Sequence, residues 1–297
     1  MNPEKMEIYP VVIIGAGPAG LAAAMQLKRQ GIDPVVLERK QVGGLLLNAN
    51  LVENYPGFVK GISGPDLVKL FGNQADRLGV DILIEEVISV HYEKANFRIV
   101  TNCREFHARI LIAATGTVPV KLTDHLVNED VKEKIYYEVF PLINEIDKEF
   151  IIIGAGDAAY DYALNLSRRN EITILNRGSN INALPLLVER IEKKSRISYH
   201  SEVEVTGINK NKNGKLVVGA QKKGLAMVCD YVIAAIGRTP NYNFADQSII
   251  DGMKKLLKDQ KLFLIGDLQN GSFRQTSIAV ADGIRVAMTI AQILEKG

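Results

Sequence analysis

The chain has 297 residues, of which 47% are hydrophobic and 24% are charged, and its formal net charge is +2. These values are ordinary for a globular protein of one large or two smaller domains, and the charge argues neither for nor against a nucleic-acid or membrane partner. Two cysteines, Cys103 and Cys229, lie far apart, which excludes a Cys-x-x-Cys pair and a multi-cysteine zinc site. We do not expect a secreted disulfide framework from two such cysteines and therefore expect a cytoplasmic protein.

The N-terminal residues predict a β-α-β unit. Tyr9–Ile14 and Pro34–Leu37 are short apolar runs typical of buried parallel strands, and Pro18–Gln30 between them is typical of a helix. This order is the unit of a right-handed parallel crossover. The apolar run 11–25 is too short to span a bilayer and contains glycines and a proline, so we expect neither a targeting segment nor membrane insertion.

The same pattern recurs further along the chain, and the two copies imply two dinucleotide-binding domains. The second copy comprises a strand at Phe150–Ile153, a helix at Asp157–Arg169 and a strand at Glu171–Leu175. Between the copies, a helix is predicted over Ser63–Leu78, with Ser63 as its N-cap and a proline near its start.

Two similar strand exits indicate where the chain passes between domains. The apolar strands at 107–115 and 230–236 stop at Gly116 and Gly237, and each glycine is followed closely by a proline. We therefore predict an α/β fold with two Rossmann-like domains of the three-layer ββα type. Residues 1–116 and 237–297 form one domain, into which 117–236 is inserted. The last strand is expected at 261–267 and a final helix at about 274–294, and the Lys-rich segments 210–215 and 221–224 read as hairpin turns.

The first glycine motif predicts a nucleotide site. Gly15, Gly17 and Gly20 form G-x-G-x-x-G between a strand and a helix, where the glycines permit a tight turn, a close approach to a diphosphate, and helix–strand packing. The diphosphate then lies at the positive N-terminus of the helix. Glu38 closes the next strand, where its carboxylate can accept hydrogen bonds from a ribose diol.

Further motifs identify the nucleotide through a family resemblance. Gly43-Gly44 follows Glu38-Arg39-Lys40, Glu53-Asn54-Tyr55-Pro56-Gly57 comes next, and Gly266-Asp267 and Arg274-Gln275-Thr276 lie near the C-terminus. Together these resemble the small thioredoxin-reductase-like flavoproteins of the pyridine-nucleotide oxidoreductase family, and the resemblance covers nearly the whole chain.

The resemblance implies an FAD site with assigned roles for several residues. Asp267 is expected to hydrogen-bond the ribityl chain of FAD. The N-terminus of the last helix is expected to face the edge of the flavin that becomes negative on reduction. Tyr55 either stacks on the isoalloxazine or is a core aromatic. The expected FAD contacts are Gly15, Gly17, Pro18, Ala19, Gly20, Glu38, Arg39, Gly44, Asn54, Tyr55, Ala114, Thr115, Gly116, Gly266, Asp267, Arg274, Gln275 and Thr276.

The second glycine motif predicts a nicotinamide site. Gly154, Gly156, Asp157 and Ala158 belong to G-x-G-x-x-A, an accepted variant. The next strand ends at Asn176-Arg177, which favours NADP slightly, because NAD sites usually carry an acid there and NADP sites an arginine. The NADP-binding members of the resembled family carry two more arginines, where this chain has Gly178 and Asn182. NADH or NADPH preference is therefore left open.

The redox disulfide of thioredoxin reductases is missing. Its Cys-x-x-Cys pair lies where this chain has Tyr137-Glu138-Val139-Phe140. The segment resembles instead the thioredoxin-reductase-like ferredoxin/flavodoxin–NADP reductases, which lack these cysteines and often carry an acid after the second glycine, as Asp157 does here. These reductases usually have a C-terminal extension that covers the flavin, and we expect no counterpart of it here, because the last predicted helix lies at the end of the sequence.

We therefore expect a flavin-dependent NAD(P)H oxidoreductase that passes hydride from nicotinamide to flavin N5 and then electrons to a ferredoxin, a flavodoxin or a small molecule. No catalytic side chain is needed, and the four scattered histidines predict no metal site. The alternatives are an FAD-binding sensor with a degenerate nicotinamide site, and an NAD(P)H diaphorase or oxidase. The resemblance also implies a homodimer. A basic run at 193–196 is either a docking site for an acidic partner or a solvated helix end.

Overall fold

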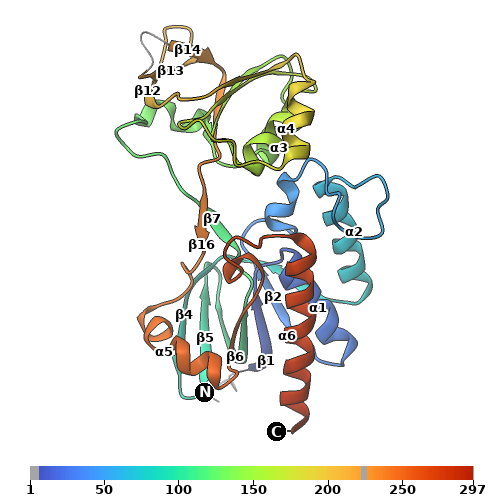
Figure 1. Cartoon of the computed structure of the whole chain (residues 1–297). Coiled ribbons are helices and arrows are strands. Elements are labelled where there is room, and N and C mark those ends of the chain that lie inside the picture. Colours follow the sequence, from blue (N-terminus) through green and yellow to red (C-terminus); the bar gives the residue numbers. More distant parts are fainter. Residues whose placement is uncertain (1–6, 222–225, 297) are drawn as a thin grey trace. The chain divides into compact units, whose positions relative to one another are not determined.

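The computed structural model describes residues 7–221 and 226–296, and the chain forms two compact units (Figure 1). The first unit comprises Met1–Leu47, Val52–Val118 and Pro240–Gly297, and the second comprises Asn48–Leu51 and Pro119–Thr239. The two crossings, β7 (Thr117–Pro119) and β16 (Arg238–Pro240), pair with each other in a two-stranded ribbon. They lie within three residues of the exits predicted at Gly116 and Gly237. The turn predicted at 221–224 lies almost entirely outside the described residues.

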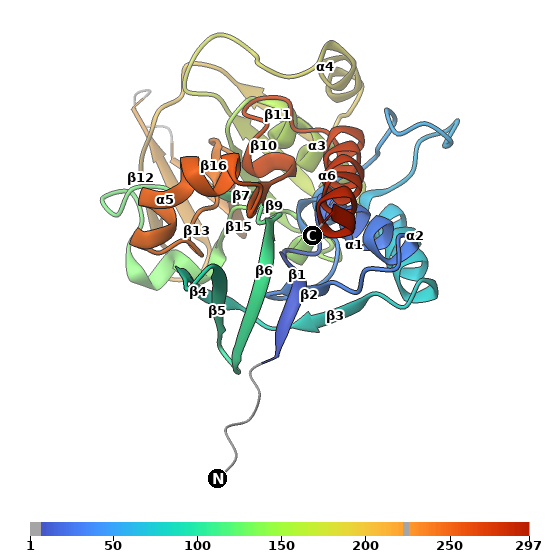
Figure 2. The ribbon, with the colours of Figure 1, turned by 90° about the horizontal axis from the view of Figure 1, so that it is seen from below.

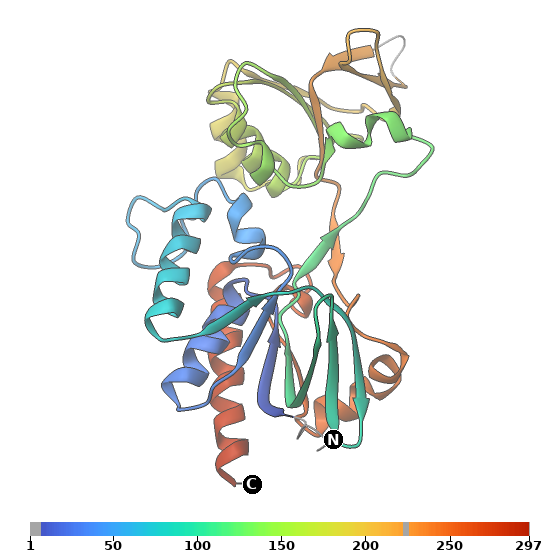
Figure 3. The same ribbon diagram turned by 180° about the vertical axis from the view of Figure 1, so that it is seen from behind.

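A seven-stranded sheet forms the centre of the first unit (Figure 2). Its parallel strands are β1 (Ile8–Ile14), β2 (Val35–Glu38), β3 (Asp81–Ile84), β6 (Glu105–Ala113) and β17 (Leu262–Leu264). The order is β3-β2-β1-β6, and β17 pairs with the last residues of β6. Beyond β6, β5 (Asn96–Thr101) and β4 (Val87–Glu93) continue as an antiparallel hairpin (Figure 3). The central parallel strands are buried along most of their length, which explains their unbroken apolar sequences.

Among the described residues, the first unit also contains four helices and two short 3-10 helices. The helices are α1 (Pro18–Arg29), α2 (Gly64–Arg77), α5 (Gln247–Lys258) and α6 (Thr276–Lys296), with short 3-10 helices η1 (Gly44–Asn48) and η4 (Gly266–Leu268). Apolar side chains of β1 and β2 pack with Phe97 and Ile99 of the hairpin and Ile249 of α5 in one core. The predicted N-cap of α2 is confirmed, because the Ser63 hydroxyl accepts a bond from the Asp66 amide at 3.2 Å.

The last helix packs closely against the first. A Cβ atom at Gly283 of α6 would lie 2.2 Å from the carbonyl oxygen of Ala19 and 2.8 Å from the amide nitrogen of Ala23, so only glycine fits this contact. By length and composition alone, α6 is apolar enough to cross a membrane. However, α6 crosses α1 closely and carries a buried acid, Asp282, as expected of a helix packed within the first unit.

The second unit has two sheets. Five parallel strands follow the order β11-β10-β9-β15-β8, with β8 (Ile135–Tyr136), β9 (Glu149–Ile153), β10 (Glu171–Leu175), β11 (Ile197–His200) and β15 (Tyr231–Ala234). The antiparallel sheet comprises β12 (Val205–Lys210), β13 (Leu216–Ala220) and β14 (Ala226–Cys229). Its helices are α3 (Asp157–Leu166) and α4 (Pro185–Glu192), with 3-10 turns η2 (Glu129–Lys134) and η3 (Phe140–Leu142).

Each face of the five-stranded sheet carries its own core. Ile152 and Ile174 pack with Tyr160 and Ala163 of α3 on one face, and Ile151 packs with residues of the antiparallel sheet on the other. The hairpin turn predicted at 210–215 is confirmed between β12 and β13, where the Gly214 amide donates to the Asn211 carbonyl at 3.0 Å. Helix α3 ends at Leu166, three residues before its predicted end at Arg169.

The crossing of α1 and α6 gives a test of this packing. Gly283→Ala is expected to lower the thermal unfolding midpoint, because its Cβ would overlap backbone atoms of α1, and overpacking of this kind typically costs about 1–3 kcal/mol. Gly72→Ala in α2 is the matched control, because its Cβ meets nothing within 4 Å. Replacing a helical glycine there should stabilise by about 0.4–1 kcal/mol. Circular dichroism melts compare the two, and equal effects would contradict the packing.

Candidate dinucleotide-binding sites

The first glycine turn joins β1 to α1 and has no room for side chains on its inner side. Gly15 has φ +105°, and a Cβ on it would lie 2.4 Å from the Ala114 carbonyl oxygen at the end of β6. A Cβ on Gly20 would lie 1.9 Å from the Gly15 carbonyl oxygen. The turn therefore depends on glycine at both positions. This places the N-terminus of α1 at the carboxyl edge of the parallel sheet, where nucleotides bind in such folds.

The outer side of the same turn is open. A Cβ on Gly17 meets nothing within 4 Å, so this glycine is not required by packing within the chain. Open space beside the first amides of a helix suits a diphosphate, because those amides have no partner inside the helix. The residues present therefore fit the diphosphate of a dinucleotide, with Gly17, Pro18 and Ala19 beside it.

Glu38 lies at the end of β2, beside the glycine turn. Its side chain is nearly buried, and its two oxygens accept bonds from the Ala16 amide at 2.9 Å and the Lys40 amide at 3.1 Å. These contacts orient the carboxylate beside the glycine turn, and its predicted contact with a ribose diol stays a prediction. The neighbouring Arg39 is exposed.

The loop after β2 folds back over the glycine turn. The Gly43 amide donates to the Ala16 carbonyl at 2.9 Å, and a Cβ on Gly44 would lie 3.4 Å from the Cα atom of Gly17. Gly43 has φ +112° and its Cβ would overlap Val68 of α2, so this position also requires glycine. Sequence reasoning emphasised Gly44 and missed the constraint on Gly43.

The segment 53–57 meets the start of α6. The Asn54 side-chain amide donates to Gln275 at 2.8 Å, and the Ser277 hydroxyl donates to the Asn54 carbonyl at 3.4 Å. Residues predicted from opposite ends of the sequence to contact the flavin are therefore neighbours. Arg274 and Thr276 flank Gln275 at the same helix start, where backbone amides and the helix dipole favour negative charge.

Gly266 and Asp267 form the first residues of η4, next to α1. A Cβ on Gly266 would lie 2.9 Å from the Cβ of Ala19, and its amide donates to the Asp282 carboxylate at 3.3 Å. Asp282 also accepts a bond from the Asn270 side chain at 2.6 Å and is only 7% exposed. Sequence reasoning missed Asp282, although an acid inside an apolar helix is a readable signal of a buried polar contact.

The exit of β6 is held by a residue from the second crossing. The Thr115 hydroxyl donates to the Asn241 carbonyl at 2.7 Å, and the Asn241 amide donates to the Gly116 carbonyl at 3.0 Å. Ala114 closes the inner side of the glycine turn, as described for Gly15. The residues Ala114, Thr115 and Gly116, which are predicted FAD contacts, thus lie next to that turn. Asn241, which the sequence analysis did not single out, is bonded to two of them.

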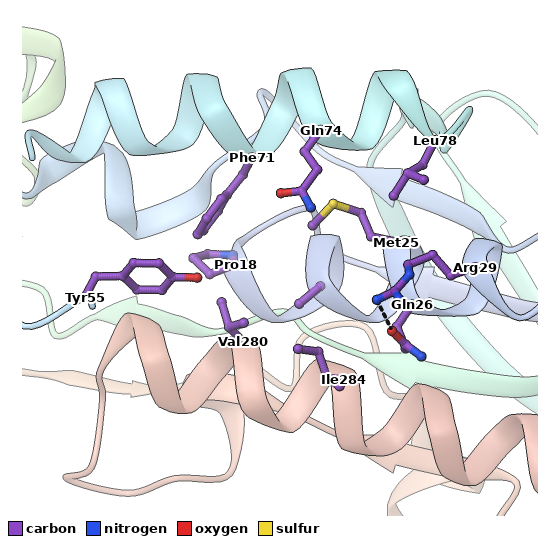
Figure 4. A pocket seen from close by; sticks show the side chains of 11 residues that line it. Pro18, Met25, Gln26, Arg29, Tyr55, Phe71, Gln74, Leu78, Val280 and Ile284 are labelled. Atoms are coloured by element: carbon purple, nitrogen blue, oxygen red, sulfur yellow. Dashed lines mark hydrogen bonds between the residues drawn. The ribbon is translucent and has the colours of Figure 1, made fainter. Parts of the chain in front are cut away.

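Tyr55 contacts other aromatic rings. Its ring lies 5.8 Å from Phe71 and 6.2 Å from Phe58, and burial raises the pKa of its hydroxyl. It lines a groove of about 180 Å³ between α1, α2 and α6, together with Pro18, Met25 and Ile284 (Figure 4). Tyr55 is half-buried in this groove and is not one of the buried core residues, so its stacking on the flavin stays a prediction.

The second unit repeats the glycine turn. Gly154 has φ +129°, and a Cβ on it would lie 2.3 Å from the Ala235 carbonyl oxygen at the end of β15. A Cβ on Gly156 meets nothing within 4 Å, so the outer side is open here too. Asp157 and Ala158 begin α3 and are exposed. These residues fit a second dinucleotide diphosphate by the same test as the first turn.

The loop after β10 is tied to this turn. The Asn182 amide donates to the Ala155 carbonyl at 3.0 Å, and the Leu184 amide donates to the Asp157 carboxylate at 2.8 Å. Asp157 therefore holds the loop, a role that the sequence did not reveal. Asn176 is only 8% exposed, and its side chain is bonded to the loop and to Tyr199 of β11, whereas Arg177 is exposed.

The four residues 137–140, where the resembled enzymes carry their disulfide, are part of the packed structure. The Tyr137 hydroxyl accepts a bond from the Leu122 amide at 3.2 Å, and Glu138 pairs with Arg238 at 3.3 Å. Val139 is fully buried among core residues, and Phe140 begins η3. These four residues therefore make structural contacts and include no thiol.

Neither cysteine lies at that position. Cys103 is exposed in the first unit, and Cys229 is buried in the second, where burial raises the pKa of its thiol to about 12. A thiol with such a pKa is a poor nucleophile at neutral pH. Within residues 7–221 and 226–296, no group of three metal-binding side chains occurs.

Comparisons with known proteins identify the family. The sequence pattern of the family described as Pyridine nucleotide-disulphide oxidoreductase matches residues 9–283. Thioredoxin reductase of Rickettsia prowazekii is 31% identical over 307 residues, covering 96% of this chain and 98% of that protein. Thioredoxin reductase of Listeria monocytogenes is also 31% identical, covering 93% and 91%.

Solved structures give the same result. Lactococcus lactis thioredoxin reductase superposes with a TM-score of 0.84 at 26% identity, covering 97% of this chain and 100% of that one. Bacillithiol disulfide reductase of Staphylococcus aureus, at 20% identity and a TM-score of 0.73, shares the fold, and the coverage is 98% and 100%. With two open glycine turns and a matching pattern over almost its whole length, the chain belongs to the pyridine nucleotide-disulphide oxidoreductase family, as a thioredoxin-reductase-like, FAD- and NAD(P)-dependent oxidoreductase.

Proposed function

We propose that this protein oxidises NADH or NADPH through FAD without a redox disulfide, and passes the electrons to a ferredoxin, a flavodoxin or a small-molecule acceptor. The observation that carries the proposal is the packing of residues 137–140. A buried valine and a Glu138–Arg238 ion pair stand there in place of a dithiol. Reduction of thioredoxin, which the related enzymes' names describe, therefore does not transfer to this chain.

The residues of the first unit would hold FAD, which supplies hydride acceptance from a reduced nicotinamide when bound. Gly17 leaves room for the diphosphate, and Glu38 offers its carboxylate to the adenosine ribose. Asp267 and the start of α6 would hold the ribityl chain and the flavin edge, as the resemblance implies. The amides of α6 favour negative charge and so favour the reduced cofactor.

The residues of the second unit would hold the nicotinamide nucleotide. Gly156 leaves room for its diphosphate at the start of α3. The loop that follows β10 carries Arg177 and no acid, which supports use of both coenzymes with a preference for NADPH. The sensor alternative predicts that no nicotinamide binds, and the oxidase alternative predicts that oxygen is the fastest acceptor.

Anaerobic titration of the FAD-loaded protein tests the proposal. Both NADH and NADPH should bleach the flavin absorbance near 450 nm, because each can transfer a hydride when held against the ring, at roughly 3–3.5 Å. Replacing Gly17 by a bulky residue should prevent FAD loading, since its side chain would fill the open side of the turn. If neither coenzyme reduces tightly bound FAD, the sensor alternative replaces the proposal.

A cysteine-free protein tests whether sulfur takes part. The Cys103→Ser/Cys229→Ala variant should transfer electrons from NADPH to ferricyanide at a rate within about twofold of the native protein, because neither thiol belongs to the proposed route. FAD content measured on the same samples controls for loss of cofactor. A tenfold slower rate at full FAD content would show that a thiol is required.

A homodimer, which the resemblance implies, and a cytoplasmic location, which the two distant cysteines indicate, are further parts of the proposal. Light scattering coupled to gel filtration checks the first directly, because the chain mass is 32.7 kDa. A dimer gives about twice that value, whereas a monomer at micromolar concentration would remove this part without affecting the redox chemistry.

A further inference from the structure

The loop from Asn176 to Asn182 is fixed by backbone contacts on two sides. On one side, the Asn176 amide donates to the His200 carbonyl at 2.9 Å, the Val203 amide donates to the Asn176 carbonyl at 2.9 Å, and the Glu202 amide donates to the Gly178 carbonyl at 3.1 Å. On the other, the Asn182 amide donates to the Ala155 carbonyl of the glycine turn at 3.0 Å. The loop is therefore attached to both β11 and the nucleotide-binding turn.

The side chain of Asn176 holds the middle of the loop. Its amide nitrogen donates to the Asn180 carbonyl at 2.9 Å and to the Tyr199 hydroxyl at 2.8 Å, and its oxygen accepts from the Gly178 amide at 3.1 Å. Both hydrogens of the amide are used, and the side chain is buried. Asn176 therefore has no donor left for a ribose or a phosphate, which changes the role predicted for it from ligand contact to support.

Arg177 is the only charged residue from 176 to 184, and it follows Asn176 directly. A single arginine contributes most when its backbone is held before the ligand arrives, because less conformational entropy is then lost on binding. The NADP-binding members of the resembled family carry three arginines in this loop. This chain has Arg177 alone, preceded by the hydrogen-bonded Asn176.

We propose that Asn176 and Tyr199 are positioning residues that fix the loop so that Arg177 alone recognises the 2′-phosphate of NADPH. This inference rests on the proposed function only in assuming that a nicotinamide nucleotide occupies the second site. Tyr199 lies on β11 and its ring packs near Tyr160 of α3, with centroids 6.4 Å apart, so its hydroxyl is held by the core of the second unit. Through this hydroxyl, the packed core restrains the loop.

Calorimetry on the FAD-loaded protein tests this inference, with FAD occupying the first site. The probes are adenosine 2′,5′-bisphosphate and 5′-AMP, which differ only in the 2′-phosphate. Arg177→Ala should weaken binding of the bisphosphate by about 10- to 100-fold and leave 5′-AMP nearly unchanged. Tyr199→Phe keeps the ring and removes only the hydroxyl, and should weaken the bisphosphate about 3- to 10-fold, again selectively.

A double-mutant cycle shows whether Tyr199 acts through Arg177. The Arg177→Ala/Tyr199→Phe variant should bind the bisphosphate no more weakly than Arg177→Ala alone, because the support has nothing left to position. Ser179→Ala, an exposed change in the same loop, is the control and should alter neither probe. Asn176→Ala should follow Tyr199→Phe, and melting curves identify any variant that has not folded.

Three results would overturn the inference: equal loss of both probes in Tyr199→Phe, additive losses in the double variant, or no selectivity for the bisphosphate in the native protein. Each is distinguishable from failure of the proposed function, because probe binding is measured without any electron transfer. If the protein binds the bisphosphate selectively but its flavin is not reduced by NADPH, the proposed reaction is wrong and the positioning role is unaffected.

Discussion

The close approach of backbone to backbone at two glycine turns is the constraint on which both sites depend. Gly15 lies against the Ala114 carbonyl and Gly154 against the Ala235 carbonyl, at distances that no Cβ atom tolerates. Each turn thereby places a helix N-terminus at the carboxyl edge of a parallel sheet. At the next glycine of each motif, Gly17 and Gly156, the outer side of the turn is open. A closed inner side and an open outer side fit the diphosphate of a dinucleotide.

Much of this arrangement could be predicted from the sequence, because local sequence patterns identify the two turns. A buried strand, three spaced glycines and a helix predict the turn, and Glu38 follows at the spacing of the next strand. The first-unit contacts Asn54 and Gln275 needed more than local pattern, since they are 221 residues apart and meet only in the fold. The family resemblance predicted that both residues contact the flavin, and the structure shows that their side chains are hydrogen-bonded to each other.

Other features could not be read, and in each case a distant partner decides the role. The side-chain amide of Asn176 donates to the hydroxyl of Tyr199, which is 23 residues away. Asp157 looked like a marker of one enzyme branch and proves to hold Leu184. Residues 48–51 belong to the second unit although they lie in the first third of the sequence, with the Asn50 amide donating to Asp161 at 2.8 Å. Burial raises the pKa of that carboxyl to about 6.

The packing of residues 137–140 separates this chain from its thioredoxin-reducing relatives. A valine, a tyrosine hydroxyl and a Glu138–Arg238 pair make ordinary structural contacts there. In the proposed reaction, the chemistry is performed by the two bound cofactors. The protein then contributes position and electrostatic field, and no side chain has to change its covalent state.

The number of electrons that the protein stores tests this account most directly. Anaerobic titration with dithionite, followed by flavin absorbance and by residual reducing equivalents, measures that number for the FAD-loaded chain. The account predicts about two electrons per bound FAD, because the flavin is the sole redox centre. Uptake of about four would reveal a second two-electron centre, as a disulfide would provide, and would contradict it.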